Sequence, residues 1–118
     1  MTCLIASLSI GKGTWGHVSR LIAEGQWDKI FLITNEFGRE NFNNEKKAEL
    51  IVIDSRKAIE EIREEIKNGL KGKISDTEVA INFVSGEGKE HMALLSAVLQ
   101  LGLGMRFFAL TKDGVKEV

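Results

Sequence analysis

The sequence predicts a doubly wound α/β fold with a mainly parallel sheet, and three observations carry this prediction. Apolar runs of strand length alternate with segments of helical period along the 118 residues. The runs are apolar throughout rather than at every second residue, which is typical of parallel strands covered on both faces. Glycine-rich turns join strands to helices at two places. The length and the ordinary apolar and charged fractions, 43% and 28%, indicate one domain over residues 1–118.

The first half of the chain yields three strands and one helix. We expect strands at Thr2–Ile10, Lys29–Asn35 and Glu49–Asp54, and a helix from Thr14 or Trp15 to Gly25. Between the second and third strands, Glu36–Lys47 is polar and mixed, which favours a loop with a helical turn around Asn44–Ala48.

The second half yields two helices, two strands and a terminal hairpin. Ser55 is expected to cap a helix whose apolar residues recur with the 3.6 period and which closes at Asn68-Gly69. A fourth strand at Val79–Val84, a helix from about Lys89 to Leu101 and a fifth strand at Met105–Leu110 follow. Asp113-Gly114 predicts a tight turn that returns Val115–Val118 as a short antiparallel edge, so the sheet has five to six strands.

The composition limits the kinds of molecule that the chain is expected to bind. The formal net charge of −1 gives no general attraction to nucleic acid, so any anion site is local. The one cysteine, Cys3, lies in an apolar run and fits a buried thiol in a reducing cytoplasm. No secretory leader or membrane span is expected, since the longest apolar helical pattern is about half the ~20 residues that a bilayer requires.

The expected strand order, 3-2-1-4-5, places strands 1 and 4 side by side at the topological switch point. Open α/β sheets bind ligands there, at the carboxyl ends of the strands. Each of these two strands is followed by a glycine-rich junction, so we expect the two junctions to converge.

The first junction is Ile10-Gly11-Lys12-Gly13-Thr14-Trp15-Gly16-His17. Glycines at a strand-to-helix turn expose backbone N–H groups where the helix dipole favours an anion. Gly11, Gly13 and Gly16 also match the dinucleotide fingerprint, and Glu36 lies where such folds carry the acid that binds ribose. A small regulatory NAD-binding module is therefore one interpretation, although Trp15 and His17 add bulk beside the glycines.

The second junction is Ser85-Gly86-Glu87-Gly88-Lys89-Glu90-His91. It lacks the P-loop spacing, but its glycines, hydroxyl and ammonium at a helix start suit a phosphodiester or a developing oxyanion. The alternative is that the glycines of both junctions only make tight turns.

Other polar and aromatic residues near the junctions have two interpretations each. His17 and His91 are either capping and packing residues or a base or phosphate donor, since imidazole titrates near neutrality. Trp15 either stacks on a base or plugs the core. Asn35 ends the second strand beside the same crevice and is a ligand candidate. Neither the cysteine count nor the histidine spacing predicts a metal site.

The two junctions in this Rossmann-like context resemble the CARF domain, the CRISPR-associated Rossmann fold that senses cyclic oligoadenylates in type III CRISPR defence. The resemblance rests on Ser9–Trp15 after the first strand and on Asn82–Met92 after the fourth. The second segment is similar to the family's Asn-x-(Ser/Thr)-Gly-Gly-Thr-Lys-x-Met motif, with one extra residue before Ser85 and with Glu87-Gly88 where Gly-Thr is usual.

Stand-alone CARF proteins resemble ring nucleases, which bind the cyclic messenger across a homodimer and cut it without a metal or other cofactor. The resemblance implies that Ser9 or Thr14 and Lys89 are the active groups, with His17 as a further catalytic candidate. The expected ligand contacts come from Gly11, Lys12, Gly13, Trp15, Gly16, Asn35, Ser85, Gly86, Gly88 and His91. Three hypotheses stay open: a ring nuclease or related ribonuclease, a sensor that binds without cutting and acts through a CRISPR effector partner, and the NAD-type module.

Overall fold

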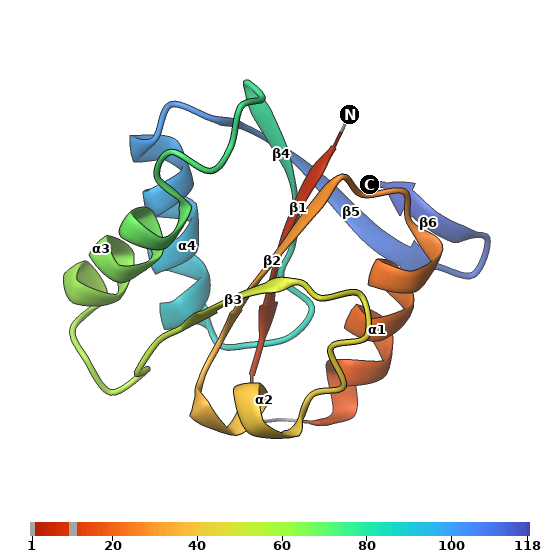
Figure 1. Cartoon of the computed structure of the whole chain (residues 1–118), viewed down its shortest axis with the longest axis horizontal. Coiled ribbons are helices and arrows are strands. Elements are labelled where there is room, and N and C mark those ends of the chain that lie inside the picture. Colours follow the sequence, from red (N-terminus) through yellow and green to blue (C-terminus); the bar gives the residue numbers. More distant parts are fainter. Residues whose placement is uncertain (1, 10–11) are drawn as a thin grey trace.

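The computed structural model describes residues 2–9 and 12–118 and shows a six-stranded sheet between helices (Figure 1). The elements are β1 (Cys3–Leu8), a 3₁₀ turn (Lys12–Thr14), α1 (Trp15–Glu24), β2 (Lys29–Thr34), α2 (Glu36–Asn41), β3 (Glu49–Val52), α3 (Ile59–Leu70), β4 (Glu78–Asn82), α4 (Gly88–Gln100), β5 (Gly104–Thr111) and β6 (Gly114–Glu117). The strand order is β3-β2-β1-β4-β5-β6. All neighbours are parallel except β5 and β6, which confirms the predicted doubly wound fold and its antiparallel edge.

The central strand β1 is buried along its whole length because helices cover both faces of the sheet. Cys3 and Ile5 face the core under α3 and α4, whereas Leu4, Ala6 and Leu8 face the core under α1. This alternation is the period of two that a strand imposes. Figure 1 shows the two layers, with α3 and α4 on one side of the sheet and α1 on the other.

The segment after β2 departs from the prediction. Glu36–Asn41 forms the short helix α2, whereas the predicted helical turn at Asn44–Ala48 is a non-helical turn held by the Asn44 side chain. The helix begins here because Asn35 Oδ1 accepts a hydrogen bond from Gly38 N at 2.9 Å, as an N-cap residue does. Gly38 is buried against Thr34, where a β-carbon would lie 1.9 Å from Oγ1.

The start of α3 also differs. We expected Ser55 to cap this helix, but the helix begins at Ile59 after Ala58, with no side-chain cap. Asp54 instead accepts hydrogen bonds from the backbone and the guanidinium of Arg56, which makes a turn of residues 54–57. The amphipathic face predicted for this helix is confirmed, since Ile62, Ile66 and Leu70 are buried.

The terminal hairpin extends the sheet beyond β4. Phe108 and Val115 from β5 and β6 pack on the α1 side. Among the helices that the structure describes, none is long and apolar enough to cross a membrane.

Candidate functional site

The two glycine-rich junctions meet at the carboxyl ends of β1 and β4, as predicted. Ser9 N donates a hydrogen bond to Ser85 Oγ at 2.9 Å, and Ser7 Oγ donates to the Ser85 carbonyl oxygen. Ser85 is fully buried, so its side chain joins the two junctions and leaves no surface for a ligand. We assign it a positioning role in place of the predicted ligand contact.

At the first junction, Lys12, Gly13 and Gly16 are exposed, and Thr14 is half-buried. A β-carbon on Gly13 or Gly16 would meet no atom within 4 Å, so this surface is open to a ligand. The predicted ligand residue Gly11 lies outside the described residues.

Trp15 behaves as a core plug rather than as a free stacking platform. Its Nε1 donates to the Ser9 carbonyl oxygen at 2.7 Å, and its ring packs against Phe37 and Phe42 with centroid distances of 5.8 and 5.7 Å. The exposed ring at this junction is Phe37, with Lys12 Nζ 5.5 Å from its centroid. Sequence reasoning missed Phe37 because it placed a loop where α2 holds this ring.

The N-terminus of α4 carries two carboxylates. The Glu87 side chain accepts from the backbone N–H of Glu90, and the Glu90 side chain accepts from Glu87 N at 2.9 Å. This capping box occupies backbone donors that we expected to bind phosphate. Gly86 adopts a φ of +109°, which requires glycine, and Gly88 is exposed with open space around it. The capping box thus removes two backbone N–H groups, those of Glu87 and Glu90, from anion binding at the second junction.

The cation of the second junction is Lys89. This half-buried side chain reaches from the first turn of α4 to the turn after β3, where Nζ donates to the Ser55 carbonyl oxygen at 3.0 Å. The ammonium thus lies over the carboxyl edge of the sheet on the α3–α4 side. Lys12 is the cation of the first junction, and its Nζ lies 5.8 Å from the centroid of the Trp15 ring.

Both histidines make structural hydrogen bonds. Leu110 N donates to His17 Nε2 at 3.3 Å, and the buried Asn82 amide lies 3.2 Å from the same nitrogen. His17 Nε2 is therefore an acceptor, and the ring is neutral with its proton on Nδ1. His91 Nε2 donates to the Ser85 carbonyl oxygen at 2.9 Å, and its ring stacks on Phe83.

The state of His17 predicts a pH dependence of stability. Burial lowers the pKa of His17 below its ordinary value of 6.5, so the unfolded chain binds this proton more readily than the folded chain. The contribution of neutral His17 to the free energy of unfolding is therefore complete above pH 6.5. It is lost as the pH falls through the lowered pKa of the folded chain. The His17→Gln variant keeps an acceptor in its amide oxygen but has no imidazole to protonate. Its free energy of unfolding, measured with urea, should therefore fall less between pH 7 and pH 5 than that of the native chain. An equal loss in both proteins would contradict the assignment.

A cavity of about 420 Å³ opens beside the junctions at the carboxyl ends of β2 and β3. We call it the edge cavity. Its lining residues are Asn35, Glu36, Phe37, Val52, Ile53, Asp54, Ser55, Arg56, Lys57 and Glu65. Phe37 connects it to Lys12 and the first junction, and the Ser55 carbonyl connects it to Lys89. Of the predicted site residues, Asn35 lines this cavity.

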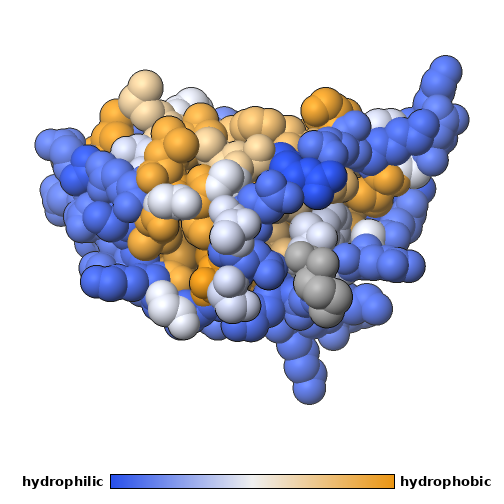
Figure 2. Space-filling model, turned by 90° about the horizontal axis from the view of Figure 1, so that it is seen from above, coloured by the Kyte–Doolittle hydropathy of each residue, from blue (hydrophilic) through white to orange (hydrophobic). Residues whose placement is uncertain are grey.

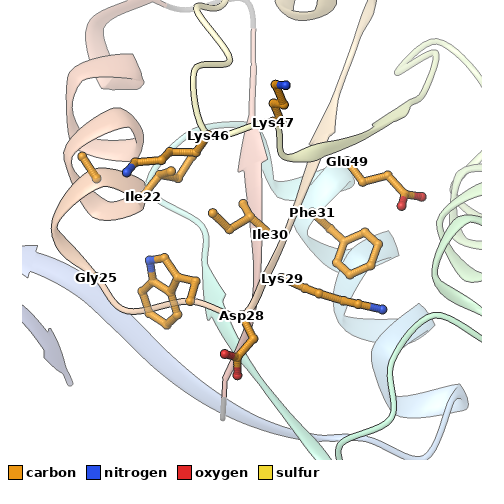
Figure 3. A pocket seen from close by; sticks show the side chains of 11 residues that line it. Ile22, Gly25, Asp28, Lys29, Ile30, Phe31, Lys46, Lys47 and Glu49 are labelled. Carbon is orange, nitrogen blue, oxygen red and sulfur yellow. The ribbon is translucent and has the colours of Figure 1, made fainter.

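A second cavity of about 360 Å³ lies at the opposite end of β2 and has a different character (Figure 3). Ile22 and Ile30 form part of its wall, and Lys46 extends across it. Lys29 Nζ donates to the Lys73 carbonyl oxygen at 2.7 Å, and the Asp28 side chain points in a different direction. The charged side chains that line this cavity are of both signs and do not point to a common place, so the cavity does not suit an anion.

Among residues 2–9 and 12–118, no three histidine, cysteine, aspartate or glutamate side chains are grouped so that they could hold a metal ion. Compared with protein-family models and with curated proteins, the chain matches none.

Proposed function

We propose that this chain binds cyclic oligoadenylate at the carboxyl edge of its sheet and cleaves it, as a ring nuclease of type III CRISPR defence in the cytoplasm. The observation that supports the proposal is the hydrogen-bonded pair of junctions at Ser7, Ser9 and Ser85, with Lys12 at one junction and Lys89 at the other. In this proposal a phosphodiester at the pair of junctions is bound by the ammonium groups of Lys12 and Lys89. The formal net charge of −1 gives no general attraction to long RNA, so a small ring held at a local site fits better than a linear strand.

The proposed chemistry is an in-line displacement at phosphorus. The ribose 2′-oxygen forms a bond to the adjacent phosphorus, the bond from phosphorus to the 5′-oxygen breaks, and the proton of the 2′-hydroxyl ends on the 5′-oxygen. The products are a 2′,3′-cyclic phosphate and a 5′-hydroxyl. In this scheme Lys89 stabilises the added negative charge on the phosphoryl oxygens, while Ser9 and Thr14 align the ribose for attack.

Binding without cleavage is a second candidate, and one observation favours it. Both histidines use Nε2 in hydrogen bonds to the backbone, with Leu110 N and with the Ser85 carbonyl. Neither ring therefore presents that nitrogen to a substrate as a proton carrier. A sensor of this kind would transmit binding to a CRISPR effector partner.

The NAD-type alternative depends on Glu36. This carboxylate lines the edge cavity but forms an ion pair with Arg39 at 2.5 Å within α2. A ribose would have to compete with that guanidinium for the carboxylate.

The deciding experiment incubates the pure protein with cyclic tetra- and hexa-adenylate in the presence of a chelator and separates the products by chromatography. Linear products that end in a 2′,3′-cyclic phosphate are expected. Filter binding at physiological salt should show tight binding of the ring and weak binding of linear RNA of mixed sequence. Ring binding without products favours the sensor, whereas equal affinity for ring and linear RNA overturns the proposal.

We also propose that the chain acts as a homodimer, because a symmetric ring is matched by two copies of the same loops. The outer face of α4 supports this, since Met92 and Leu99 are 61% and 62% exposed. The terminal hairpin packs toward α1 and leaves them uncovered. Figure 2, seen from above Figure 1, shows apolar surface in the middle of the molecule between hydrophilic ends.

The dimer yields a prediction of oligomeric state. Light scattering at micromolar concentration should give twice the mass of one chain for the native protein and for Val118→Asp, a substitution at another exposed apolar residue. Leu99→Asp should give the mass of a monomer, because a carboxylate on a buried interface is strongly unfavourable. A native monomer would refute the proposed dimer.

A further inference from the structure

We infer that the edge cavity is a nucleoside subsite, which takes the base and ribose of one adenylate while the phosphates lie toward the junctions. The inference rests on the proposed function, because it assigns part of the same ligand to a place in the fold. It differs from that function in naming Phe37 and Asn35, rather than the glycine loops, as the contacts of the base.

The walls of the edge cavity suit a flat heteroaromatic group. Val52 and Ile53 supply apolar surface at the end of β3, and Phe37 supplies an aromatic ring that is 39% exposed. Aromatic side chains of this exposure are the usual platforms on which bases stack. The volume of about 420 Å³ lies within the range of small-molecule sites.

The charges around the cavity are already paired, which argues against a phosphate inside it. Arg56 Nε and Nη2 each lie 3.0 Å from a carboxylate oxygen of Asp54. Lys57 pairs with Glu65 at 2.7 Å, and Glu36 pairs with Arg39. A neutral base leaves these pairs intact, whereas an anion would have to displace a carboxylate.

One polar group is available for recognition of a base. Asn35 Oδ1 accepts from Gly38 N, but its Nδ2 amino group has no hydrogen-bond partner within residues 2–9 and 12–118. Because Asn35 lines the cavity, this amino group can donate to a ring nitrogen of a bound base.

Two contacts connect the cavity to the cations of the site. Lys12 Nζ lies 5.5 Å from the centroid of Phe37, and Lys89 Nζ donates to the Ser55 carbonyl on the cavity wall. A nucleotide with its base on Phe37 therefore has the Lys12 ammonium beside that ring and the Lys89 ammonium beside Ser55 on the cavity wall. This juxtaposition links the neutral subsite to the phosphate sites.

The test uses adenosine, which has no phosphate and so reports on the cavity alone. Titration of the full chain, followed by amide chemical shifts in ¹H–¹⁵N spectra, should shift the signals of residues 35–37 and 52–57. Phe37→Leu should weaken adenosine binding about 5- to 150-fold, the range that corresponds to loss of one base–aromatic stack. Phe37→Trp should restore binding, because it restores an aromatic face.

A matched control separates this effect from loss of any exposed aromatic ring. Phe107 on β5 is 40% exposed, and Phe107→Leu should leave adenosine binding unchanged. The inference is overturned if millimolar adenosine does not shift the amide signals of the protein. It is also overturned if Phe37→Leu binds adenosine as tightly as the native chain. Ring binding that is independent of Phe37 would reject the subsite and keep the proposed function. Adenosine binding that depends on Phe37, in a chain that does not bind the ring, would reject the proposed function and keep the nucleoside site.

Discussion

Lys89→Ala is expected to lower the rate of cyclic oligoadenylate cleavage by about 10²–10³-fold, the usual cost of removing one donor that stabilises an oxyanion. Lys89 is the cation of the second junction, and the Glu87–Glu90 capping box occupies two of the backbone N–H groups beside it, those of Glu87 and Glu90. No nearby backbone N–H of that box can therefore replace the lost ammonium. Single-turnover assays with cyclic tetra-adenylate measure the effect, and Lys89→Arg should restore part of the rate.

Two substitutions serve as controls for Lys89. Lys71→Ala removes an exposed ammonium at the C-terminal end of α3, away from the carboxyl edge, and should leave the rate unchanged. Glu36→Ala tests the dinucleotide interpretation and should leave turnover largely intact, because Glu36 lines the edge cavity with its carboxylate paired to Arg39 and is not assigned a contact with the nucleoside. If Glu36→Ala abolishes nucleotide binding while Lys89→Ala does not, the dinucleotide interpretation replaces ours.

Gly86→Ala is expected to lower the free energy of unfolding by about 1–3 kcal/mol, the cost of holding a non-glycine residue in a disfavoured backbone region. The φ of +109° at Gly86 strains any L-residue. A β-carbon there would also lie 2.8 Å from His91 Nε2 and 3.3 Å from Ser7 Oγ. The substitution therefore pushes on both hydrogen bonds to the Ser85 carbonyl. Urea denaturation followed by circular dichroism measures the loss.

Gly88→Ala is the matched control for Gly86. It lies two residues further along, has open space around its Cα and begins α4. Alanine there should be neutral or slightly stabilising, since alanine favours the helix over glycine. An equal loss of stability in both variants would show that the backbone conformation of Gly86 is not the cause.

The fold could be predicted because its signals are periodic and local. Continuous apolar runs such as Ile30–Ile33 predicted buried parallel strands, and the strand order followed from the rules of doubly wound sheets. Helix α2 was missed because it is short and is held by its Asn35 cap, by the close approach of Gly38 to Thr34 and by the packing of Phe37 against Trp15. None of these contacts leaves a periodic signal in six residues.

The meeting of the two junctions could be predicted, but the contacts of individual side chains there could not. Convergence of the junctions followed from strand order, and the hydrogen bonds of Ser85 confirm it. The partners of individual side chains depend on tertiary distances that a sequence pattern does not contain. His17 contacts Leu110, 93 residues away, and Lys89 contacts Ser55, 34 residues away. For the same reason Phe37 and the turn after β3 were not among the predicted site residues.

Because β1 lies in the middle of the sheet, the two junctions can meet only after β4 has been added beside it. β1 is synthesised before its neighbour β4, which ends at Asn82, and the contact between Ser7 and Ser85 spans 78 residues. Such non-local contacts form late, because the entropy of closing a long loop must be overcome before they contribute. A ribosome-bound chain with β1 and β2 alone thus has one edge of β1 unpaired and no second junction. The proposed ligand site therefore requires β4 and the junction that follows it, and a chain that ends before Ser85 is expected not to bind cyclic oligoadenylate.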